Sequence, residues 1–522
     1  MLKPTSQSKM KKLLFILLMS QGVWAQIPTA KLDSLVLDAM KKFNVAGSAV
    51  AIVKDGKIIH NKGYGIKSIV TKQPVNELTN FAIASNSKAF TCAALAMLVE
   101  DGKLSWTDKV TDHIPEFKMY NDYVTQNFNI QDLLTHRSGL GLGIGDLMFF
   151  PNGSDFTMKD ILKSFQYYEP QSAFRTKFDY DNQLYFVAGE VILRVSGMTW
   201  EQFVQTRILN PLGMNHSYSA LSSIQDKSNL ASPHNDVKGT LKQLPDWDDM
   251  INGAAGGIYA NTTDLCQWML VHLNKGKYGQ DLKSQLFSAD SQREMWKIHT
   301  VEDDFGGRYN THFAGYGLGW FLKDVKGNMM VTHTGGLPGM LSITTLIPDL
   351  NLGIVVLTNT AEGGGAMFSA VNNTIADSYL GLSDFGWTDK YVTAMAGVHG
   401  EADAVTDNVW KTVKINAKVK IDSKQYIGIY EDKWFGKAEV FMKGKQLWFK
   451  SYRSPKLNGP MHFYKANSFA IKWEYQDMNA DAFATFNLDE EGKAQGIKLK
   501  GISPTIDFSF DFQDLDFRRV EK

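Results

Sequence analysis

The chain has 522 residues, of which 44% are hydrophobic and 21% are charged, a composition typical of a soluble globular protein. Its 55 Lys and Arg residues equal its 55 Asp and Glu residues, so the formal net charge is zero. Without a basic excess, the sequence does not indicate nucleic acid or an anionic membrane surface as a partner. The length exceeds one ordinary core and predicts two or three domains.

The first 25 residues have the pattern of a bacterial secretory leader. Lys9, Lys11 and Lys12 form a positive segment, an apolar run follows at 13–19, and Ala25 ends a small-residue cleavage site. The apolar run is too short to span a bilayer. The alternative is an anchor that stays in place. We expect cleavage, a periplasmic or secreted protein, and no membrane span afterwards.

Metal and cofactor signals are weak throughout the sequence. Cys92 and Cys266 are the only cysteines, too few for a disulfide framework or a four-cysteine zinc site. The glycine-rich segment 139–145 resembles a nucleotide loop, but no strand of a βαβ unit precedes it. His136 is interpreted as holding a turn. We therefore expect no metal and no cofactor.

The first two-thirds of the chain mixes helices and strands. Apolar periodicity and turn residues predict helices over 32–43, 85–101, 263–273 and 366–380, and strands over 48–53, 58–64, 329–333, 341–346 and 353–357. Residues 110–250 alternate short helical patterns with loops rich in glycine, proline and asparagine. These elements predict an α+β domain over residues 26–383.

The rest of the chain has a different pattern. Residues 384–415 are weakly periodic and predict a linker that carries one possible helix. Residues 416–522 contain short strands separated by glycine turns, typical of a small all-β sandwich or barrel. Core packing is the favoured role for Trp434, Trp448 and Trp473, and a binding surface is the alternative.

Ser85-Asn86-Ser87-Lys88 is the first candidate for chemistry, at the start of the predicted helix 85–101. Residues three apart share one face of a helix, so Lys88 can hydrogen-bond the Ser85 hydroxyl. A buried amine loses its proton more easily and can activate a serine without histidine. The spacing alone is not diagnostic, because Ser6 and Lys9 repeat it inside the predicted leader.

Tyr180-Asp181-Asn182 is the second candidate, just before an apolar helical stretch. A phenol beside an ammonium group has its phenolate form favoured, so Tyr180 can serve as a base. The amide of Asn182 can orient the lysine or a substrate carbonyl. Taken alone, the motif is an ordinary loop signature.

His333-Thr334-Gly335-Gly336 is the third candidate, at the end of the predicted strand 329–333. Glycines there let a substrate backbone approach and add to the strand edge. The amide of Gly336 can pair with that of Ser85 as an oxyanion hole. Taken alone, the motif is a strand end followed by a glycine turn.

In combination the three motifs resemble the serine β-lactamase and penicillin-binding superfamily. The second motif, Tyr-x-Asn, is similar to that of the class C β-lactamase and D,D-peptidase branch, which also includes esterases. Further phrases agree, at residues 132–140, 256–260, 263–265 and 333–339. The resemblance covers about residues 30–382, and the β-rich tail is similar to lipocalin-like accessory domains of some members.

The resemblance implies an antiparallel sheet flanked by helices, with a helical lobe and Ser85 between them. Ser85 would be the nucleophile, and Lys88 and Tyr180 would share the role of base, with the choice between them left open. Asn182 would orient Lys88 and the substrate, His333, Thr334 and Gly335 would line the substrate site, and the amides of Ser85 and Gly336 would hold the oxyanion.

One departure from the family pattern narrows the implied activity. Class C β-lactamases usually have lysine where this chain has His333, and histidine is only partly charged near neutral pH. We expect a D,D-peptidase, D-aminopeptidase or esterase acting on a small peptide, amide or ester, with weak or absent β-lactam hydrolysis. The alternative is a catalytically silent relative that binds cell-wall peptide or β-lactam as a sensor or scaffold. The sequence does not indicate an oligomeric state.

Overall fold

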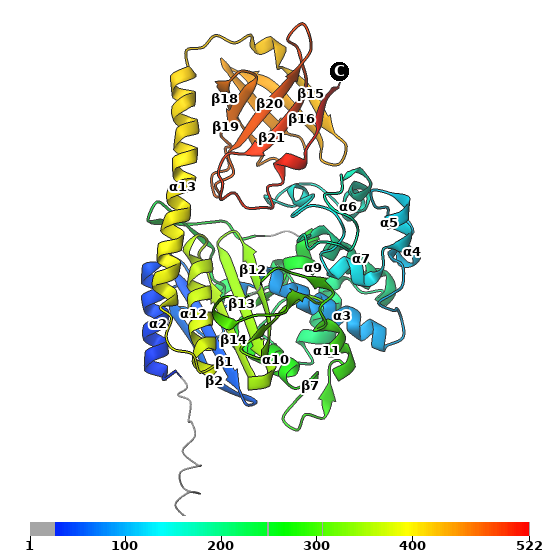
Figure 1. The fold of residues 1–522 in the computed structure, drawn as a ribbon, viewed down its shortest axis with the longest axis vertical. Coiled ribbons are helices and arrows are strands. Elements are labelled where there is room, and N and C mark those ends of the chain that lie inside the picture. The colour runs from blue at the N-terminus through cyan, green and yellow to red at the C-terminus, as the bar shows by residue number, and fades with distance from the viewer. Residues whose placement is uncertain (1–26, 248–249, 305, 521–522) are drawn as a thin grey trace, which may run out of the picture.

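A computed structural model describes residues 27–247, 250–304 and 306–520. The predicted leader, residues 1–25, lies outside the described residues. The chain forms an α+β part and a separate β-barrel, joined by one long helix (Figure 1). Among the described helices, none has both the length and the apolarity that crossing a bilayer requires.

An antiparallel sheet of eight strands forms the centre of the α+β part, in the order β2-β1-β14-β13-β12-β11-β10-β9. Its strands are β1 (Gly47–Lys54), β2 (Lys57–Gly65), β9 (Thr300–Val301), β10 (Ala314–Tyr316), β11 (Phe321–Val325), β12 (Asn328–Leu337), β13 (Met340–Ile347) and β14 (Leu352–Thr358). The first strand pairs with the last, from Ser48 opposite Thr358 to Lys54 opposite Leu352. Every residue of β14 is buried, because helices cover both faces of the sheet.

Each face of the sheet has its own helices. On one face, α2 (Thr29–Lys42) and α12 (Gly363–Tyr379) pack their apolar residues against side chains of the central strands. On the other face, α10 (Thr262–Leu273) contacts β1 and β14, and α3 (Ser87–Glu100) is buried beside it. The predicted sheet flanked by helices is confirmed.

A helical lobe packs around α3 and completes the α+β part. Its helices are α4 (Val110–His113), α5 (Asp122–Asn127), α6 (Met158–Ser164), α7 (Gln183–Ser196), α8 (Trp200–Val204), α9 (Gly253–Gly256) and α11 (Ala289–Met295). Three short strand pairs accompany it, namely β3 (Phe81–Ala82) with β6 (Tyr259–Ala260), β4 (His234–Val237) with β5 (Thr240–Gln243), and β7 (Lys277–Tyr278) with β8 (Ser284–Gln285). Helices α7 and α9 both contact α3, so α3 lies between the lobe and the sheet.

The C-terminal part is a closed barrel, which decides between the predicted sandwich and barrel. Its strands are β15 (Gly428–Asp432), β16 (Gly436–Lys443), β17 (Gln446–Ser451), β18 (Asn458–Lys465), β19 (Ser468–Ile471), β20 (Ala482–Leu488), β21 (Ala494–Gly501) and β22 (Phe517–Val520). Trp434 and Trp473 are buried in its core, whereas Trp448 is half-buried under Lys443, whose Nζ lies 3.7 Å from the ring centre.

The segment between the two parts is one helix of 30 residues, α13 (Trp387–Asn416). Figure 1 shows α13 running along the α+β part and up beside the barrel, and it contacts α12, β18 and β19. Where the sequence predicted a linker with one possible helix, the chain is helical almost throughout.

Strand β12 is longer than the sequence predicted. The prediction ended the strand at His333 and placed a glycine loop after it, but β12 continues to Leu337. Gly335 pairs with Ser342 and Gly336 with Leu341. The presence of glycine at 335 has a steric reason, because a Cβ there would lie 2.1 Å from the carbonyl oxygen of Ile83. The glycine permits a close approach inside a strand rather than a turn.

Candidate active site

Ser85 lies in a single 3₁₀ turn, Ala84–Asn86, directly before α3. The residue before it, Ala84, has a φ of 48°, a left-handed conformation that is unfavourable for a residue with a side chain. Two contacts hold this turn against β13, because Asn86 Nδ2 donates to Ser342 Oγ at 2.8 Å and Ser342 Oγ donates to the Ile83 carbonyl at 2.7 Å. The serine is therefore on a strained and well-supported turn.

Lys88 is fully buried in the first turn of α3, behind the serine. Its Nζ donates to Ser85 Oγ at 3.1 Å, to Asn182 Oδ1 at 2.7 Å and to the Ala255 carbonyl at 3.3 Å. Burial lowers the pKa of Lys88 to about 7, against the opposing effect of the carboxyl groups of Asp146 and Asp181. A substantial fraction of the amine is therefore neutral near pH 7.

Tyr180 packs over Lys88, with the ammonium nitrogen 4.7 Å from its ring centre. Burial raises the pKa of Tyr180 above its usual value, and a hydrogen bond with Ser85 only partly offsets the increase. The expectation that its phenolate form is favoured is therefore wrong. The reason is that desolvation of the phenolate outweighs its attraction to the lysine.

His333 lies on β12 with both ring nitrogens engaged. Nε2 lies 3.0 Å from the Tyr316 hydroxyl, and Nδ1 lies 2.5 Å from the Thr334 carbonyl. Burial, with the nearby Lys88 charge, lowers the pKa of His333 to about 3. The ring is therefore neutral, and the expectation of a histidine that is partly charged near neutral pH does not fit this site.

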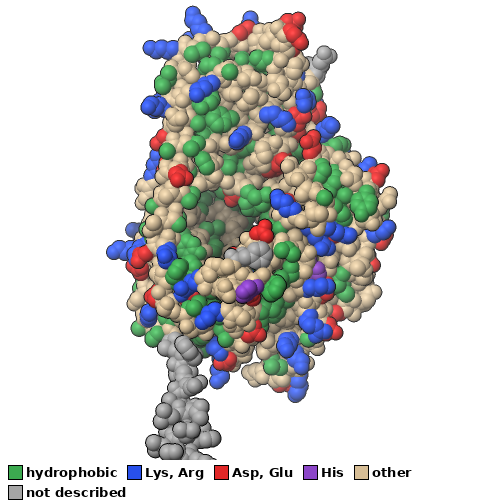
Figure 2. All heavy atoms as spheres, in the orientation of Figure 1, with side chains coloured by type: hydrophobic (Ala, Val, Ile, Leu, Met, Phe, Trp, Pro, Cys, Tyr) green, Lys and Arg blue, Asp and Glu red, His purple; other side chains and the backbone are tan. Residues whose placement is uncertain are grey.

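One cavity of about 680 Å³ joins the predicted site residues. Its wall includes Ser85, Tyr180, Asn182, His333, Thr334, Gly335 and Gly336. In Figure 2 it is visible as a hollow between the barrel and the α+β part. From His333 to Leu337, β12 pairs with β13 and not with β11, among the described strand pairs. That stretch of strand edge faces the site and can accept an extended substrate.

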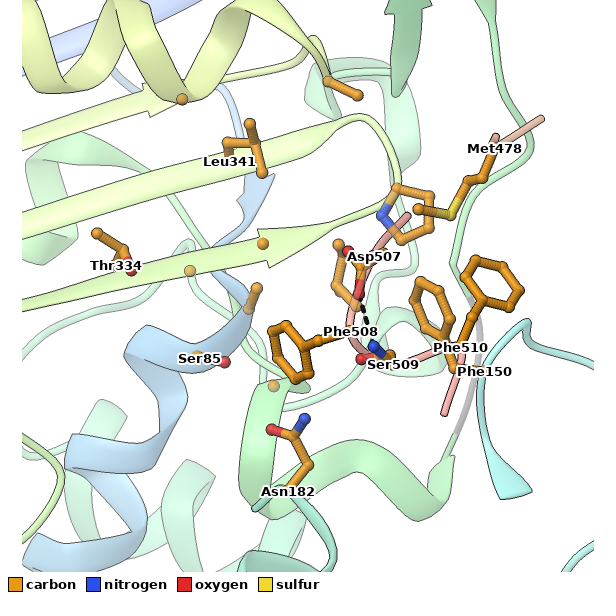
Figure 3. Close-up of a pocket in the computed structure, with 18 of the residues that line it drawn as sticks. Ser85, Phe150, Asn182, Thr334, Leu341, Met478, Asp507, Phe508, Ser509 and Phe510 are labelled. Carbon is orange, nitrogen blue, oxygen red and sulfur yellow. Dashed lines mark hydrogen bonds between the residues drawn. The ribbon is translucent and has the colours of Figure 1, made fainter. Parts of the chain in front are cut away.

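Two groups of this site were not identified from the sequence. Asp146 is fully buried, and its Oδ2 accepts hydrogen bonds from Asn182 Nδ2 and from Ser509 Oγ, both at 2.8 Å. The second group, the barrel segment 505–510, lines the cavity opposite Ser85 (Figure 3). Nothing in the sequence near residue 509 indicates its partner, since 363 positions separate it from Asp146.

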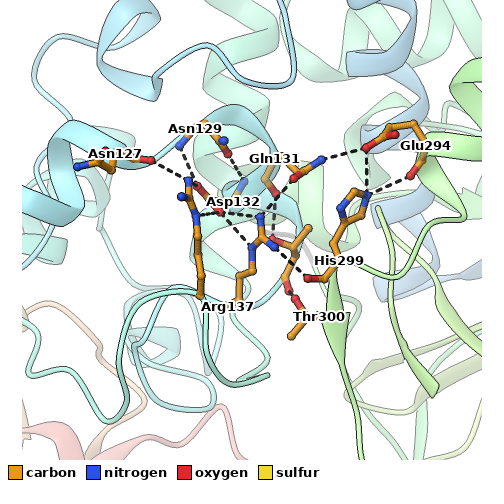
Figure 4. Close-up of polar contacts among 10 residues, drawn as sticks. Asn127, Asn129, Gln131, Asp132, Arg137, Glu294, His299 and Thr300 are labelled. Atoms are coloured by element: carbon orange, nitrogen blue, oxygen red, sulfur yellow. Dashed lines mark hydrogen bonds and ion pairs between the residues drawn. The ribbon is translucent and has the colours of Figure 1, made fainter. Parts of the chain in front are cut away.

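The phrase 132–140 supports the site without joining it. Asp132 is fully buried and accepts from Arg137 Nε at 3.1 Å and from Arg175 Nε at 2.9 Å (Figure 4). His136 accepts the Asp181 amide on Nδ1 at 3.0 Å and stacks on Tyr180 with ring centres 4.2 Å apart. The phrase therefore fixes the backbone that carries Tyr180 and Asn182, in agreement with His136 as the holder of a turn.

A serine beside a buried lysine, set between an antiparallel sheet and a helical lobe, defines the class of proteins built on the serine β-lactamase and penicillin-binding fold. The chain belongs to the Beta-lactamase family, whose model matches residues 32–373. A second model, described as a domain of unknown function (DUF3471), matches residues 420–519, which include the barrel strands.

Relatives with assigned names are about a quarter identical to the chain over the residues that align. The unguisins hydrolase ungD of Aspergillus violaceofuscus is 27% identical over 383 residues, which cover 69% of this chain and 67% of that protein. Protein flp of Staphylococcus aureus strain MW2 is 26% identical over 329 residues, 63% of this chain. The chain spans 62% of the staphylococcal protein, less than two-thirds of its length.

Two solved structures are similar in fold over nearly the whole chain. The octameric penicillin-binding protein homologue from Pyrococcus abyssi has a TM-score of 0.60 at 21% identity and covers 94% of this chain and 99% of its own. SurE has a TM-score of 0.54 at 17% identity and covers 94% of this chain and 98% of its own. At these identities the likeness establishes the fold alone.

Proposed function

We propose that the protein is a serine hydrolase that forms an acyl-enzyme on Ser85. The observation that carries the proposal is the contact of 3.1 Å between Lys88 Nζ and Ser85 Oγ, made by an amine whose pKa burial lowers to about 7. Of the two candidate bases, Lys88 is favoured, because Tyr180 keeps its proton. Family membership and a relative named as a hydrolase agree with the proposal.

In the proposed acylation, neutral Lys88 takes the proton of Ser85 as Oγ bonds to the carbonyl carbon. The carbonyl oxygen becomes an oxyanion, which the amides of Ser85 and Gly336 stabilise. The intermediate then collapses, the bond to the leaving group breaks, and Lys88 returns the proton to that group. Tyr180, a neutral phenol beside Ser85, can pass this proton along. Water then attacks the acyl carbonyl carbon as Lys88 accepts a proton from it, the bond to Ser85 Oγ breaks, and Lys88 returns the proton to Oγ as the carboxylic acid leaves.

The cavity favours an ester or amide that lacks a carboxylate near the scissile bond. Among the described lining residues there is no lysine or arginine, and His333 is neutral. A substrate carboxylate would lose water without gaining an ionic partner. We therefore infer esterase-like or D-aminopeptidase-like activity ahead of D,D-carboxypeptidase activity, and weak turnover of β-lactams.

Covalent labelling tests the nucleophile directly. A fluorophosphonate probe is expected to label the wild-type protein and not Ser85→Ala, because only the serine oxygen can bond to phosphorus. Ser223→Ala is a matched control, since Ser223 is an exposed serine outside the cavity wall. Equal labelling of wild type and Ser85→Ala would contradict the proposal.

The alternative is a protein that binds cell-wall peptide or β-lactam without turning it over. The intact contacts among Ser85, Lys88 and Asn182 favour an enzyme, because a silent relative has no need to keep a buried lysine on its serine. Turnover of p-nitrophenyl acetate by wild type, and its loss in Ser85→Ala, decides between them. Stoichiometric labelling without any turnover would favour the silent alternative.

The cellular location is also a proposal. The pattern of residues 1–25 supports export to the periplasm or the medium of a bacterial cell. N-terminal sequencing of the protein from the exporting cell is expected to begin at Gln26. A retained N-terminus would contradict cleavage.

A further inference from the structure

The catalytic cavity is built from both parts of the chain. Asp477, Met478 and Asn479 and the segment 505–510 of the barrel part line it together with Ser85 and Tyr180. Phe508 lines the cavity and is 40% exposed, and its ring centre lies 6.0 Å from that of Tyr180. A phenylalanine left exposed this near a nucleophile is available to contact substrate (Figure 3).

The wall around Phe508 includes a cluster of apolar side chains. Phe150 and Phe510 pack with ring centres 5.0 Å apart, Phe150 also packs on Trp247 at 5.1 Å, and Met478 lies beside them in Figure 3. Met478 can adapt its shape to a ligand, because its side chain is unbranched and flexible.

The acids of the wall each have a partner. Lys242 Nζ lies 2.7 Å from the Asp477 carboxylate, His399 Nε2 lies 3.3 Å from that of Glu362, and the Ser509 amide donates to Asp507 at 2.9 Å. These carboxylates need no cation from the substrate. The chemistry of the wall therefore suits an uncharged apolar group.

We propose that Phe508, Phe510, Phe150 and Met478 form a subsite for an apolar alkyl or aromatic group joined to the scissile carbonyl on its acyl or its leaving-group side. This proposal rests on the proposed serine hydrolase and names its substrate class. It makes the barrel a part of the substrate site.

Two ester series test the subsite: p-nitrophenyl esters lengthened from acetate to octanoate, and acetate esters of alcohols lengthened in the same steps. In wild type, kcat/KM is expected to rise about fourfold per added methylene in at least one series, the factor that burial of one methylene supplies. Phe508→Ala is expected to lose at least about tenfold on the longest ester of the series that responds, and its loss on the shortest ester of that series should be smaller. Phe508→Leu should keep most of the preference.

Phe313→Ala is the matched control, because Phe313 is an exposed phenylalanine outside the cavity wall. Flat profiles in both series for wild type would overturn the subsite while leaving the hydrolase intact, and so would a Phe508→Ala profile parallel to wild type. If wild type hydrolyses no ester and Ser85 takes no label, the proposed function fails and the subsite with it.

A second inference stands on a chain of hydrogen bonds that connects the barrel to the nucleophile. Ser509 Oγ donates to Asp146 Oδ2 at 2.8 Å, and Asn182 Nδ2 donates to the same oxygen at 2.8 Å. Asn182 Oδ1 then accepts from Lys88 Nζ at 2.7 Å, and Lys88 reaches Ser85. Both polar side-chain atoms of Asn182 are thereby engaged, one with Asp146 and one with the lysine.

A second contact from the barrel holds the backbone on both sides of Asp146. The fully buried carboxylate of Asp511 accepts the amides of Gly145 at 2.7 Å and Leu147 at 2.9 Å. In the same segment, the Gly143 amide donates to the Tyr180 carbonyl at 2.8 Å. The glycine-rich segment 139–145 is therefore a bridge between barrel and site.

We infer that Ser509 and Asp511 are positioning residues, which set Asp146 and Asn182 so that Lys88 points at Ser85. Other titratable groups also face Lys88 and set its charge, namely Asp181, Cys92, Tyr180, Tyr185, His136 and His333. None of them belongs to the barrel, so a change at Ser509 reaches the lysine through Asp146. This inference also rests on the proposed function.

Ser509→Ala tests the chain of contacts. We expect kcat to fall about tenfold with KM nearly unchanged, since one charge-assisted hydrogen bond is lost. The acid limb of the pH–rate profile should move to lower pH. Burial raises the pKa of Asp146 well above its usual value, and the Ser509 hydrogen bond opposes that shift. Losing the hydroxyl therefore leaves Asp146 more protonated, and less negative charge near Lys88 lowers the pKa of the lysine. Ser509→Thr, which keeps the hydroxyl, should restore both kcat and the profile.

Ser468→Ala is the control, because Ser468 lies in the barrel wall and bonds to Thr485. An unchanged kcat in Ser509→Ala would overturn the inference. So would a lower kcat that tracks only the folded fraction, with the pH–rate profile unmoved and no rescue by Ser509→Thr. Covalent labelling of Ser85 in each variant separates these outcomes from a failure of the proposed function.

Discussion

The two helices α3 and α13 differ in what surrounds them and in what they position. In α3, every residue from Ser87 to Leu98 is buried, and small side chains such as those of Ala93, Ala94 and Ala96 let the sheet and lobe approach closely. Within α13, all of which the structure describes, the buried residues are Thr388, Ala402, Val409 and Val413. The short helix carries the lysine, and the long one packs on α12 and the barrel while leaving much of its surface exposed.

The difference teaches that the long connection is not alone in placing the barrel against the site. Only four residues of helix α13 are buried, whereas buried and directional contacts of Asp511 and Ser509 join the barrel to the segment beside the nucleophile. Arg453 of the barrel also forms ion pairs with Asp155 and Asp160 of the lobe. The following predictions test this contrast.

Replacing the buried lysine of α3 should give the largest effect. Lys88→Met keeps the volume and removes the amine, so kcat/KM is expected to fall by at least about 10³-fold. Because a buried charge is replaced by an apolar group, folding should be retained. Steady-state kinetics and thermal unfolding check both statements. A variant with near wild-type kcat/KM would exclude Lys88 as the base.

The pH dependence should follow the same amine. Burial lowers the pKa of Lys88 to about 7, and the neutral form is the base, so kcat/KM should rise with pH through about 7. Burial raises the pKa of Asp146 well above its usual value, but the charged fraction of this carboxyl favours the ammonium form of Lys88. Asp146→Asn removes that charge, so the rise should move to lower pH. A rise that stays at the same pH in Asp146→Asn would argue against coupling of the two groups.

The barrel contact should give an intermediate effect. Asp511→Ala leaves the buried amides of Gly145 and Leu147 without their acceptor, at a cost of about 2–5 kcal/mol in the free energy of unfolding. Denaturant unfolding measures this cost. Glu490→Ala, an exposed glutamate at a barrel turn, is the control and should change little. Equal stability of the two variants would contradict a structural role for the Asp511 contacts.

The exposed surface of α13 should give the smallest effect. Ile415 is 70% exposed, so Ile415→Ala should change the free energy of unfolding by less than about 0.5 kcal/mol. Leu95 of α3 is fully buried, and Leu95→Ala should cost about 2–5 kcal/mol. The same denaturation measurement compares the two variants. A large decrease in the free energy of unfolding of Ile415→Ala would show that α13 contributes more to stability than its burial indicates.

Apolar periodicity and turn residues correctly predicted the helices and strands whose formation depends on neighbouring residues in the sequence. The Ala- and Leu-rich stretch 85–101 is the helix α3, and the turn after Lys54 joins two strands as expected. The exposed helix α13 was only a possible helix, because it lacks a broad apolar stripe. The length of β12 was underestimated, since glycines in a sequence indicate turns unless a close neighbour is known.

Some residues of the candidate site were predicted from the sequence and others were not. Ser85, Lys88, Tyr180, Asn182 and His333 were all predicted, and one cavity or its immediate surroundings contain them. The ionisation states of Tyr180 and His333 were not predicted correctly, because they depend on burial. Asp146 and Ser509 were missed for a different reason, since contacts between distant segments leave no periodic trace in the chain.

Gly335 has a practical meaning for anyone who wishes to redesign this protein. Any side chain there would meet the Ile83 carbonyl at 2.1 Å and wedge β12 away from the serine turn. At the next position the added carbon would meet only a leucine methyl group, at 3.2 Å. A mutagenesis library should therefore leave residue 335 untouched and vary residue 336 with small side chains. The missing Cβ at Gly335 is what lets β12 lie close to the turn that carries Ser85.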